Sequence, residues 1–140
     1  MLGDEPVDAD EVILRRFNPD DDSHVVRDEG TGDYRLRSGA FYLRPDETGH
    51  SSHRRRVLDE NQLSVDLVKN PPTYTGLAEA RVEPIRCCEP SWEVRPDPWP
   101  TGYNPTHPED VAHSLIVPTT LPKRTHVRRL AKCFAVLSMT

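Results

Sequence analysis

Residues 50–56, with the sequence HSSHRRR, hold the densest group of side chains that can do chemistry. Three successive guanidiniums cannot all be buried, and each can donate paired hydrogen bonds to phosphate oxygens. No acidic residue occurs between positions 48 and 58 to neutralise them. The segment therefore predicts an anion-binding or substrate-binding site. Its candidate residues are His50, His53, Arg54, Arg55 and Arg56.

Two further polar residues, His113 and Asp66, join these candidates. His113 is an additional imidazole that can act together with the His/Arg segment on a phosphate-bearing substrate. Asp66 shares the polar face of an alternating run, residues 63–68, with Ser64. If that face lines a cleft, the carboxylate can act as a base or a ligand; if the face is open to water, as on most antiparallel sheets, the carboxylate is only solvated.

Charge is distributed unevenly along this chain of 140 residues, whose formal net charge is −5. Residues 1–33 contain eleven acidic and three basic residues, whereas the last thirty contain five basic residues and no acidic one. Two interpretations stay open. Either the acidic N-terminal part pairs internally with Arg54–Arg56 or with the basic C-terminal part, or the basic residues bind an acidic protein partner. The negative net charge and the few aromatic residues near the bases disfavour nucleic-acid binding.

The histidine and cysteine patterns predict neither a metal nor a cofactor. The spacing His50-x-x-His53 can chelate, and His107 with His113 would add ligands, yet no HExxH or Cys-x-x-Cys motif accompanies them. The pair Cys87-Cys88 lacks the surroundings that activate a thiol. A Walker loop, GxGxxG and GxSxG are also missing, which removes the commonest nucleotide-binding and hydrolase motifs.

The chain carries no sequence signal for a membrane or for secretion. No apolar run approaches the roughly 20 residues that span a bilayer, and the acidic start MLGDEPVDADE is unlike a signal peptide. Of the three cysteines two are adjacent, which argues against a secreted disulfide scaffold. We therefore expect a cytoplasmic protein that does not contact a membrane.

The hydrophobic pattern predicts several strands. They are expected at residues 12–17, 34–37 with 40–43, 63–68 and 114–117, where apolar or β-branched residues lie near proline or glycine. Leu63, Val65 and Leu67 should be buried, as should Ile116 or its neighbours Leu115 and Val117.

The connections and the last element are also predicted from composition and periodicity. The polar residues 46–57 read as an exposed loop, and the proline-rich residues 89–106 as an extended strap that packs its aromatic rings on the domain. Pro108 suggests the first turn of a short helix. An amphipathic helix is expected over residues 126–137, with Thr125 as its N-cap. Its apolar positions are Val127, Leu130, Ala131, Phe134 and Leu137.

Strands followed by a terminal helix, without βαβ alternation, predict an α+β fold. We expect residues 12–140 to form one small domain, a mostly antiparallel, curved sheet with the C-terminal helix packed on it and long proline-rich loops. Residues 1–11 would be a flexible acidic leader.

Two classes of function are left open by the sequence. The favoured one is a non-enzymatic binding or accessory protein that acts through a protein partner. The alternative is a small enzyme that acts on a phosphate-bearing or nucleotide-type substrate through the His/Arg segment. An enzyme should gather His50, His53 or His113 with arginines in one concave pocket, whereas an interaction module should present a flat apolar patch.

Overall fold

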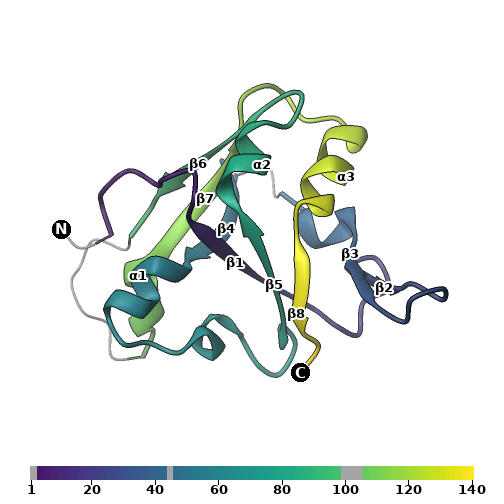
Figure 1. Ribbon diagram of the computed structural model, residues 1–140, viewed down its shortest axis with the longest axis horizontal. Helices are drawn as coiled ribbons and strands as arrows, with labels where there is room; N and C mark the ends of the chain where they lie inside the picture. Colours follow the sequence, from purple (N-terminus) through teal and green to yellow (C-terminus); the bar gives the residue numbers. More distant parts are fainter. Residues whose placement is uncertain (1–2, 44–45, 99–105) are drawn as a thin grey trace.

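Six antiparallel strands form the main sheet, in the order β6-β7-β4-β1-β5-β8 (Figure 1). The computed structural model describes residues 3–43, 46–98 and 106–140. The strands of the sheet are β1 (Val12–Phe17), β4 (His50–Arg54), β5 (Gly76–Arg81), β6 (Trp92–Pro96), β7 (His113–Pro118) and β8 (Ala135–Ser138). A separate hairpin consists of β2 (Val25–Arg27) and β3 (Tyr34–Leu36).

Short helices complete the domain. The α-helices are α1 (Arg55–Glu60), α2 (Val82–Arg86) and α3 (Arg124–Lys132), and the 3₁₀ helices are η1 (Ser38–Phe41), η2 (Val65–Val68) and η3 (Pro108–Ala112). The predicted class, a single small α+β domain built on an antiparallel sheet, is confirmed. Within the described ranges, no helix is both long enough and apolar enough to cross a membrane.

Hydrophobic residues are buried on both faces of the sheet, and β1 contributes to both. Ile13 and Phe17 belong to the larger cluster, which includes Leu130 and Phe134. Leu14 belongs to the smaller cluster under α1, η2 and η3. A strand covered on both faces reads as a continuous apolar run rather than an alternating one. This is why the sequence of β1 begins Val-Ile-Leu, and the predicted strand at residues 12–17 is confirmed.

The exposed loop predicted at residues 46–57 is wrong for its larger part, because β4 and the start of α1 lie there. β4 pairs with β1 on one side and with β7 on the other, so its side chains are enclosed despite their polarity. Their polar atoms find partners on distant segments: Ser52 Oγ lies 2.7 Å from Ser114 Oγ, and Arg54 pairs with Glu11. The polar composition of residues 50–54 predicted exposure because their hydrogen-bond partners lie far away in the sequence.

The strand predicted at residues 63–68 is also wrong. The 3₁₀ helix η2 forms there, and its N-cap Ser64 accepts a hydrogen bond from the Asp66 amide at 3.2 Å. A 3₁₀ helix repeats every three residues, so Val68 is buried while Leu67 is 37% exposed. Leu63 and Val65 are half-buried against the smaller cluster rather than fully buried as predicted.

The C-terminal helix is shorter than predicted and begins earlier. α3 spans Arg124–Lys132 with Lys123 as its N-cap, so Thr125 lies inside the helix and does not cap it. The chain then turns and forms β8 on the edge of β5. Pairing there satisfies backbone groups of β5 that an unpaired edge would leave exposed. Of the apolar positions predicted for this helix, Leu130, Ala131 and Phe134 are buried, whereas Leu137 is 45% exposed.

Other predicted segments have mixed outcomes. The strand at residues 114–117 with a buried Ile116 and the helical turn at Pro108 are confirmed. Residues 40–43 do not form a strand, since η1 ends at Phe41. The proline-rich stretch contains strand β6, in which Trp92 is 2% exposed. Residues 99–105 of that stretch lie outside the described residues.

The acidic N-terminal segment is held against the sheet from Gly3 to Glu11. Val7 and Glu11 are each 4% exposed, and the guanidinium of Arg54 bonds to the carbonyl groups of Gly3 and Glu5. Glu5, Asp8 and Glu11 therefore pair with Arg54 at the end of β4 and with Arg56 in α1.

Candidate functional site

A polar pocket opens where β1 and β4 separate in the middle of the sheet. These strands pair at Ile13 with Arg54 and at Leu14 with His53, whereas β1 continues to pair with β5 as far as Phe17. From Arg15 onward the edge of β4 is therefore no longer covered by β1.

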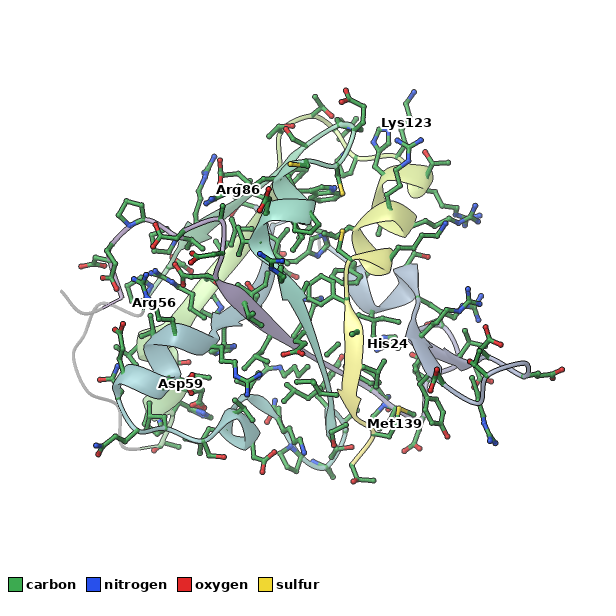
Figure 2. The ribbon with its side chains drawn as sticks, viewed as in Figure 1. His24, Arg56, Asp59, Arg86, Lys123 and Met139 are labelled. Atoms are coloured by element: carbon green, nitrogen blue, oxygen red, sulfur yellow. The ribbon has the colours of Figure 1, made fainter. Side chains whose placement is uncertain are left out.

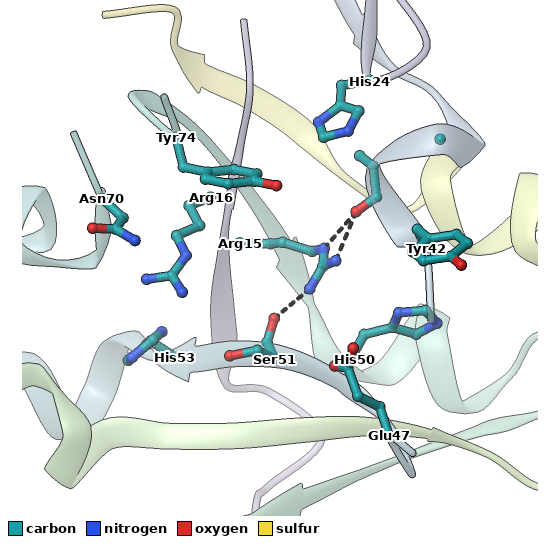
Figure 3. Close-up of a pocket in the computed structure, with 12 residues that line it drawn as sticks. Arg15, Arg16, His24, Tyr42, Glu47, His50, Ser51, His53, Asn70 and Tyr74 are labelled. Atoms are coloured by element: carbon teal, nitrogen blue, oxygen red, sulfur yellow. Dashed lines mark hydrogen bonds between the residues drawn. The ribbon is translucent and has the colours of Figure 1, made fainter. Parts of the chain in front are cut away.

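The side chain of Arg15 bridges this gap in the sheet (Figure 3). Its Nη1 donates to the carbonyl of Ser51 at 2.5 Å, and its Nε and Nη2 donate to the carbonyl of Ala40 at 3.1 and 2.6 Å. The guanidinium also lies 4.7 Å from the centre of the Phe41 ring. The carbonyl of Ser51 on β4, which β1 no longer pairs with, and the carbonyl of Ala40 on η1 are thus satisfied by a positive charge.

The pocket has a volume of about 340 Å³ and draws its walls from β1, β4, η1 and the turn at residues 70–74. Most of its lining side chains are polar or aromatic (Figure 3). The described lining residues are Arg15, Arg16, His24, Gly39, Ala40, Tyr42, Glu47, His50, Ser51, His53, Asn70 and Tyr74.

Two adjacent arginines give the pocket its charge. Burial, together with the neighbouring charge of Arg16, lowers the pKa of Arg15 to about 10, so Arg15 is still protonated at neutral pH. Arg16 is exposed, and no carboxylate in the described part of the chain lies within ion-pair distance of it. Glu47 is the one carboxylate among the described lining residues.

Two buried histidines, His50 and His53, are among the residues that line the pocket. His50 is 2% and His53 4% exposed, and neither His50 Nδ1 nor His53 Nε2 has a hydrogen-bond partner among the described residues. Burial lowers the pKa of each to about 3, helped by the charge of Arg15 at His50 and by His113 at His53. Both rings are therefore neutral at pH 7.

Aromatic rings flank this polar surface. A short bridge pins the turn at residues 70–74, because the amides and carbonyls of Asn70 and Tyr74 exchange hydrogen bonds of 2.9 and 3.0 Å. Tyr74 is 39% and Tyr42 74% exposed, so both offer ring faces to a bound molecule. The ring of His24 lies 6.3 Å from that of Tyr74.

The histidines predicted from the sequence do come together at this pocket. His50 and His53 line it, and the ring of His113 stands edge-on to His53 with 5.3 Å between centroids. Asp66 is not part of it: the carboxylate is exposed on η2 and pairs with Lys69 at 3.1 Å.

The predicted arginine cluster lies elsewhere. Arg54 is fully buried on the opposite face of β4, bonded to Glu11. Arg56, labelled in Figure 2, pairs with Asp8 of the N-terminal segment at 2.9 Å, and Arg55 pairs with Glu79 at 3.0 Å. The interpretation in which these arginines pair with the acidic leader is thus observed for Arg54 and Arg56.

Several lining residues escaped the sequence analysis. Arg15 and Arg16 were treated only as part of a predicted apolar strand. The two adjacent arginines in the run VILRRF were the signal that could have identified them as candidate site residues. Ser51, Asn70 and Tyr74 carry no local pattern that distinguishes them from surface residues. Among residues 3–43, 46–98 and 106–140, no group of three His, Cys, Asp or Glu side chains is placed to hold a metal ion.

Neither a protein-family model, nor a curated protein, nor a solved structure matches this chain.

Proposed function

We propose that the protein binds a small phosphate-bearing ligand of nucleotide type in the pocket between β1 and β4. The observation that carries the proposal is the presence of two arginines and two neutral histidines among the residues that line one concave site. Guanidinium groups match the geometry of phosphate oxygens, and an imidazole N–H adds a neutral donor. This is the alternative raised by the sequence, with Arg15 and Arg16 in the place of Arg54–Arg56.

The chemistry of the walls supports a ligand with a planar group as well as a phosphate. Tyr74 and Tyr42 provide aromatic surface next to the charged floor, and stacking on such rings accepts any base. A volume of about 340 Å³ lies at the lower end of the range for small-molecule sites. It suits a ligand of the size of a mononucleotide better than a larger molecule.

The distribution of exposed apolar side chains argues in the same direction. Among the described residues, two of the large exposed ones, Tyr42 and Tyr74, line the pocket itself, while Leu67 stands on η2 and Leu137 on β8. Singly exposed hydrophobic residues are ordinary on a protein surface, whereas an interaction module presents a contiguous patch.

We expect Arg16→Ala to weaken the binding of AMP and of inorganic phosphate by about 10- to 100-fold. A charge-assisted hydrogen bond contributes about 1.5–3 kcal/mol, and each 1.4 kcal/mol is tenfold in affinity. Isothermal titration calorimetry at low ionic strength measures the effect, and the wild-type affinity should fall as salt is added.

Arg81→Ala is the matched control, since it removes the same charge outside the pocket. Arg16 on β1 pairs with Leu77 near the start of β5, whereas Arg81 lies at the other end of that strand. The affinity of Arg81→Ala for AMP should equal that of the wild type. Equal losses in the two variants, or no binding of either probe to the wild-type protein, would contradict the proposal.

A second candidate, a protein partner with an acidic segment, is supported by a basic groove between β3 and α3. We define this basic groove by Arg35, Arg37, Arg128 and Lys132, which surround an apolar floor that includes Phe134. Its volume is about 360 Å³, and no acid occurs among its described lining residues. A peptide with glutamates and an apolar side chain matches this combination of charge and floor.

The double variant Arg128→Glu/Lys132→Glu should lower the affinity for a fluorescein-labelled, glutamate-rich peptide with a single leucine by at least about tenfold. Fluorescence anisotropy gives the affinity. The double variant Arg81→Glu/Arg95→Glu changes net charge equally at exposed positions outside the basic groove, so it serves as control. If both double variants lose the same affinity, the attraction is one of net charge and the basic groove is not a binding site.

A further inference from the structure

Ser51, His113 and Asp97 form a continuous hydrogen-bonded chain at the edge of the pocket. Ser51 Oγ lies 2.7 Å from His113 Nε2, and His113 Nδ1 lies 3.1 Å from Asp97 Oδ2. The three residues come from β4, from β7 and from the end of β6, which are neighbours in the sheet. His113 stands opposite His53 in the β4–β7 ladder, two residues from Ser51, so the register itself brings imidazole and hydroxyl together.

The surroundings of His113 fix which nitrogen carries the proton. Nδ1 faces two acceptors, the carboxylate and the backbone carbonyl of Asp97, each at 3.1 Å. The proton of a neutral ring therefore resides on Nδ1, and Nε2 is left with a lone pair that accepts the Ser51 hydroxyl proton. In this tautomer a histidine can take the proton of a serine as the oxygen attacks a substrate, and an acid on Nδ1 stabilises the imidazolium that results.

Of the three hydrogen-bonded residues, Ser51 is the one that lines the pocket. Side chains alternate along a strand, so Ser51 and His53 share one face of β4 while Ser52 points to the other, where it bonds Ser114. The carbonyl of Ser51 is held by Arg15, and Arg16 lies among the same lining residues (Figure 3). A nucleophile, its base and an anion-binding pair of arginines thus meet at one site.

We propose that Ser51 is the nucleophile of a phosphate-ester hydrolase, with His113 as its general base and Asp97 as the residue that positions His113. The inference rests on the proposed binding of a phosphate-bearing ligand and adds a reaction to it. Arg15 and Arg16 hold the phosphoryl oxygens. Guanidiniums aimed at the phosphoryl group stabilise the charge that develops on its oxygens as the bond changes.

The reaction proceeds in two balanced displacements. The Ser51 oxygen forms a bond to phosphorus while the bond from phosphorus to the alcohol oxygen breaks; the hydroxyl proton passes to His113 Nε2 and then to the departing alcohol. Water next attacks the phosphoserine and gives a proton to His113, and the serine oxygen departs and recovers that proton. The net change is one ester and one water converted to one alcohol and one phosphate.

An alkyl fluorophosphonate tests the nucleophile directly, since attack on its phosphorus expels fluoride and leaves a stable adduct. Mass spectrometry of the labelled protein should find one adduct, on the peptide that contains Ser51. His113→Gln should slow labelling by at least about 100-fold, because general-base catalysis contributes 10²–10⁴-fold. Asp97→Asn should slow it less and shift the dependence of the rate on pH, a change that a purely structural role would not produce. Ser52→Ala should be labelled like the wild type.

Release of 4-nitrophenolate from 4-nitrophenyl phosphate tests the substrate class, and Ser51→Ala should abolish it. Circular dichroism verifies that each variant is folded. If His113→Gln does not fold, the labelling rate of Asp97→Asn is compared with that of the wild type instead. Absence of the adduct, an adduct on another serine, or labelling of folded His113→Gln and Asp97→Asn at the wild-type rate would overturn the proposal. Hydrolysis of 4-nitrophenyl acetate but not of the phosphate would overturn its substrate class.

The two proposals fail separately. If AMP binds and Ser51 is not labelled, the nucleophile is refuted and the binding site stands. If Ser51 is labelled and neither AMP nor phosphate binds, the phosphate ligand is refuted and with it the assignment to phosphate esters.

Discussion

Replacing Arg54 by methionine is expected to lower the free energy of unfolding by about 3–5 kcal/mol, since it leaves a buried carboxylate without its partner. The Arg54 side chain is fully buried, and its Nε and Nη2 donate to the two carboxylate oxygens of Glu11 at 2.8 and 2.9 Å. Its Nη1 donates to the carbonyls of Gly3 and Glu5. One guanidinium therefore fastens the N-terminal segment to the centre of the sheet.

Urea denaturation measures this loss, and Arg55→Met is the matched control. Arg55 is the next residue, but its side chain is 44% exposed and its partner Glu79 30% exposed. Exposed ion pairs contribute about 0–1 kcal/mol, so the control should unfold close to the wild type. Similar free-energy changes in the two variants would show that Arg54 acts as an ordinary surface charge.

Phe134→Ala is expected to destabilise the protein by a comparable amount, about 3–5 kcal/mol, because a buried aromatic ring is replaced by a cavity. Phe134 is 7% exposed and lies between α3 and β8, with its ring 5.2 Å from that of Phe41 on η1. It thereby joins the C-terminal segment to the larger core cluster.

Leu137→Ala provides the comparison, because Leu137 lies on β8 and is 45% exposed. Thermal unfolding followed by circular dichroism should show a clear decrease of the melting temperature for Phe134→Ala and little change for Leu137→Ala. A Phe134→Ala variant that melts within a degree or two of the wild type would mean that α3 and β8 are not anchored by this ring.

Elements whose signal is local could be predicted from the sequence. The apolar run at residues 12–17 stops at Asn18-Pro19, and Pro108 begins a helical turn because its missing N–H is not needed there. The order of strands before a terminal helix gave the fold class. His50 and His53, which were singled out from their types and spacing alone, line the pocket.

Elements that depend on distant partners could not be predicted in this way. β4 has the sequence His-Ser-Ser-His-Arg, which indicates an exposed loop, yet it lies in the middle of the sheet. Its burial is tolerated because Glu11, 43 residues away, and Ser114, 62 residues away, complete its hydrogen bonds. The end of α3 was likewise decided by an edge strand, β5, that could pair with residues 135–138.

The candidate site also has a part that local sequence predicts and a part that depends on distant contacts. The sequence by itself determined that basic and imidazole side chains were concentrated near β4, since composition and spacing are local properties. The tertiary structure decided which of them share a pocket: it turned Arg54 to the opposite face, brought Arg15 and Arg16 in from β1, and placed His113 beside Ser51. A one-residue step along a strand reverses the face on which a side chain lies, and strand register is set by pairing between distant segments.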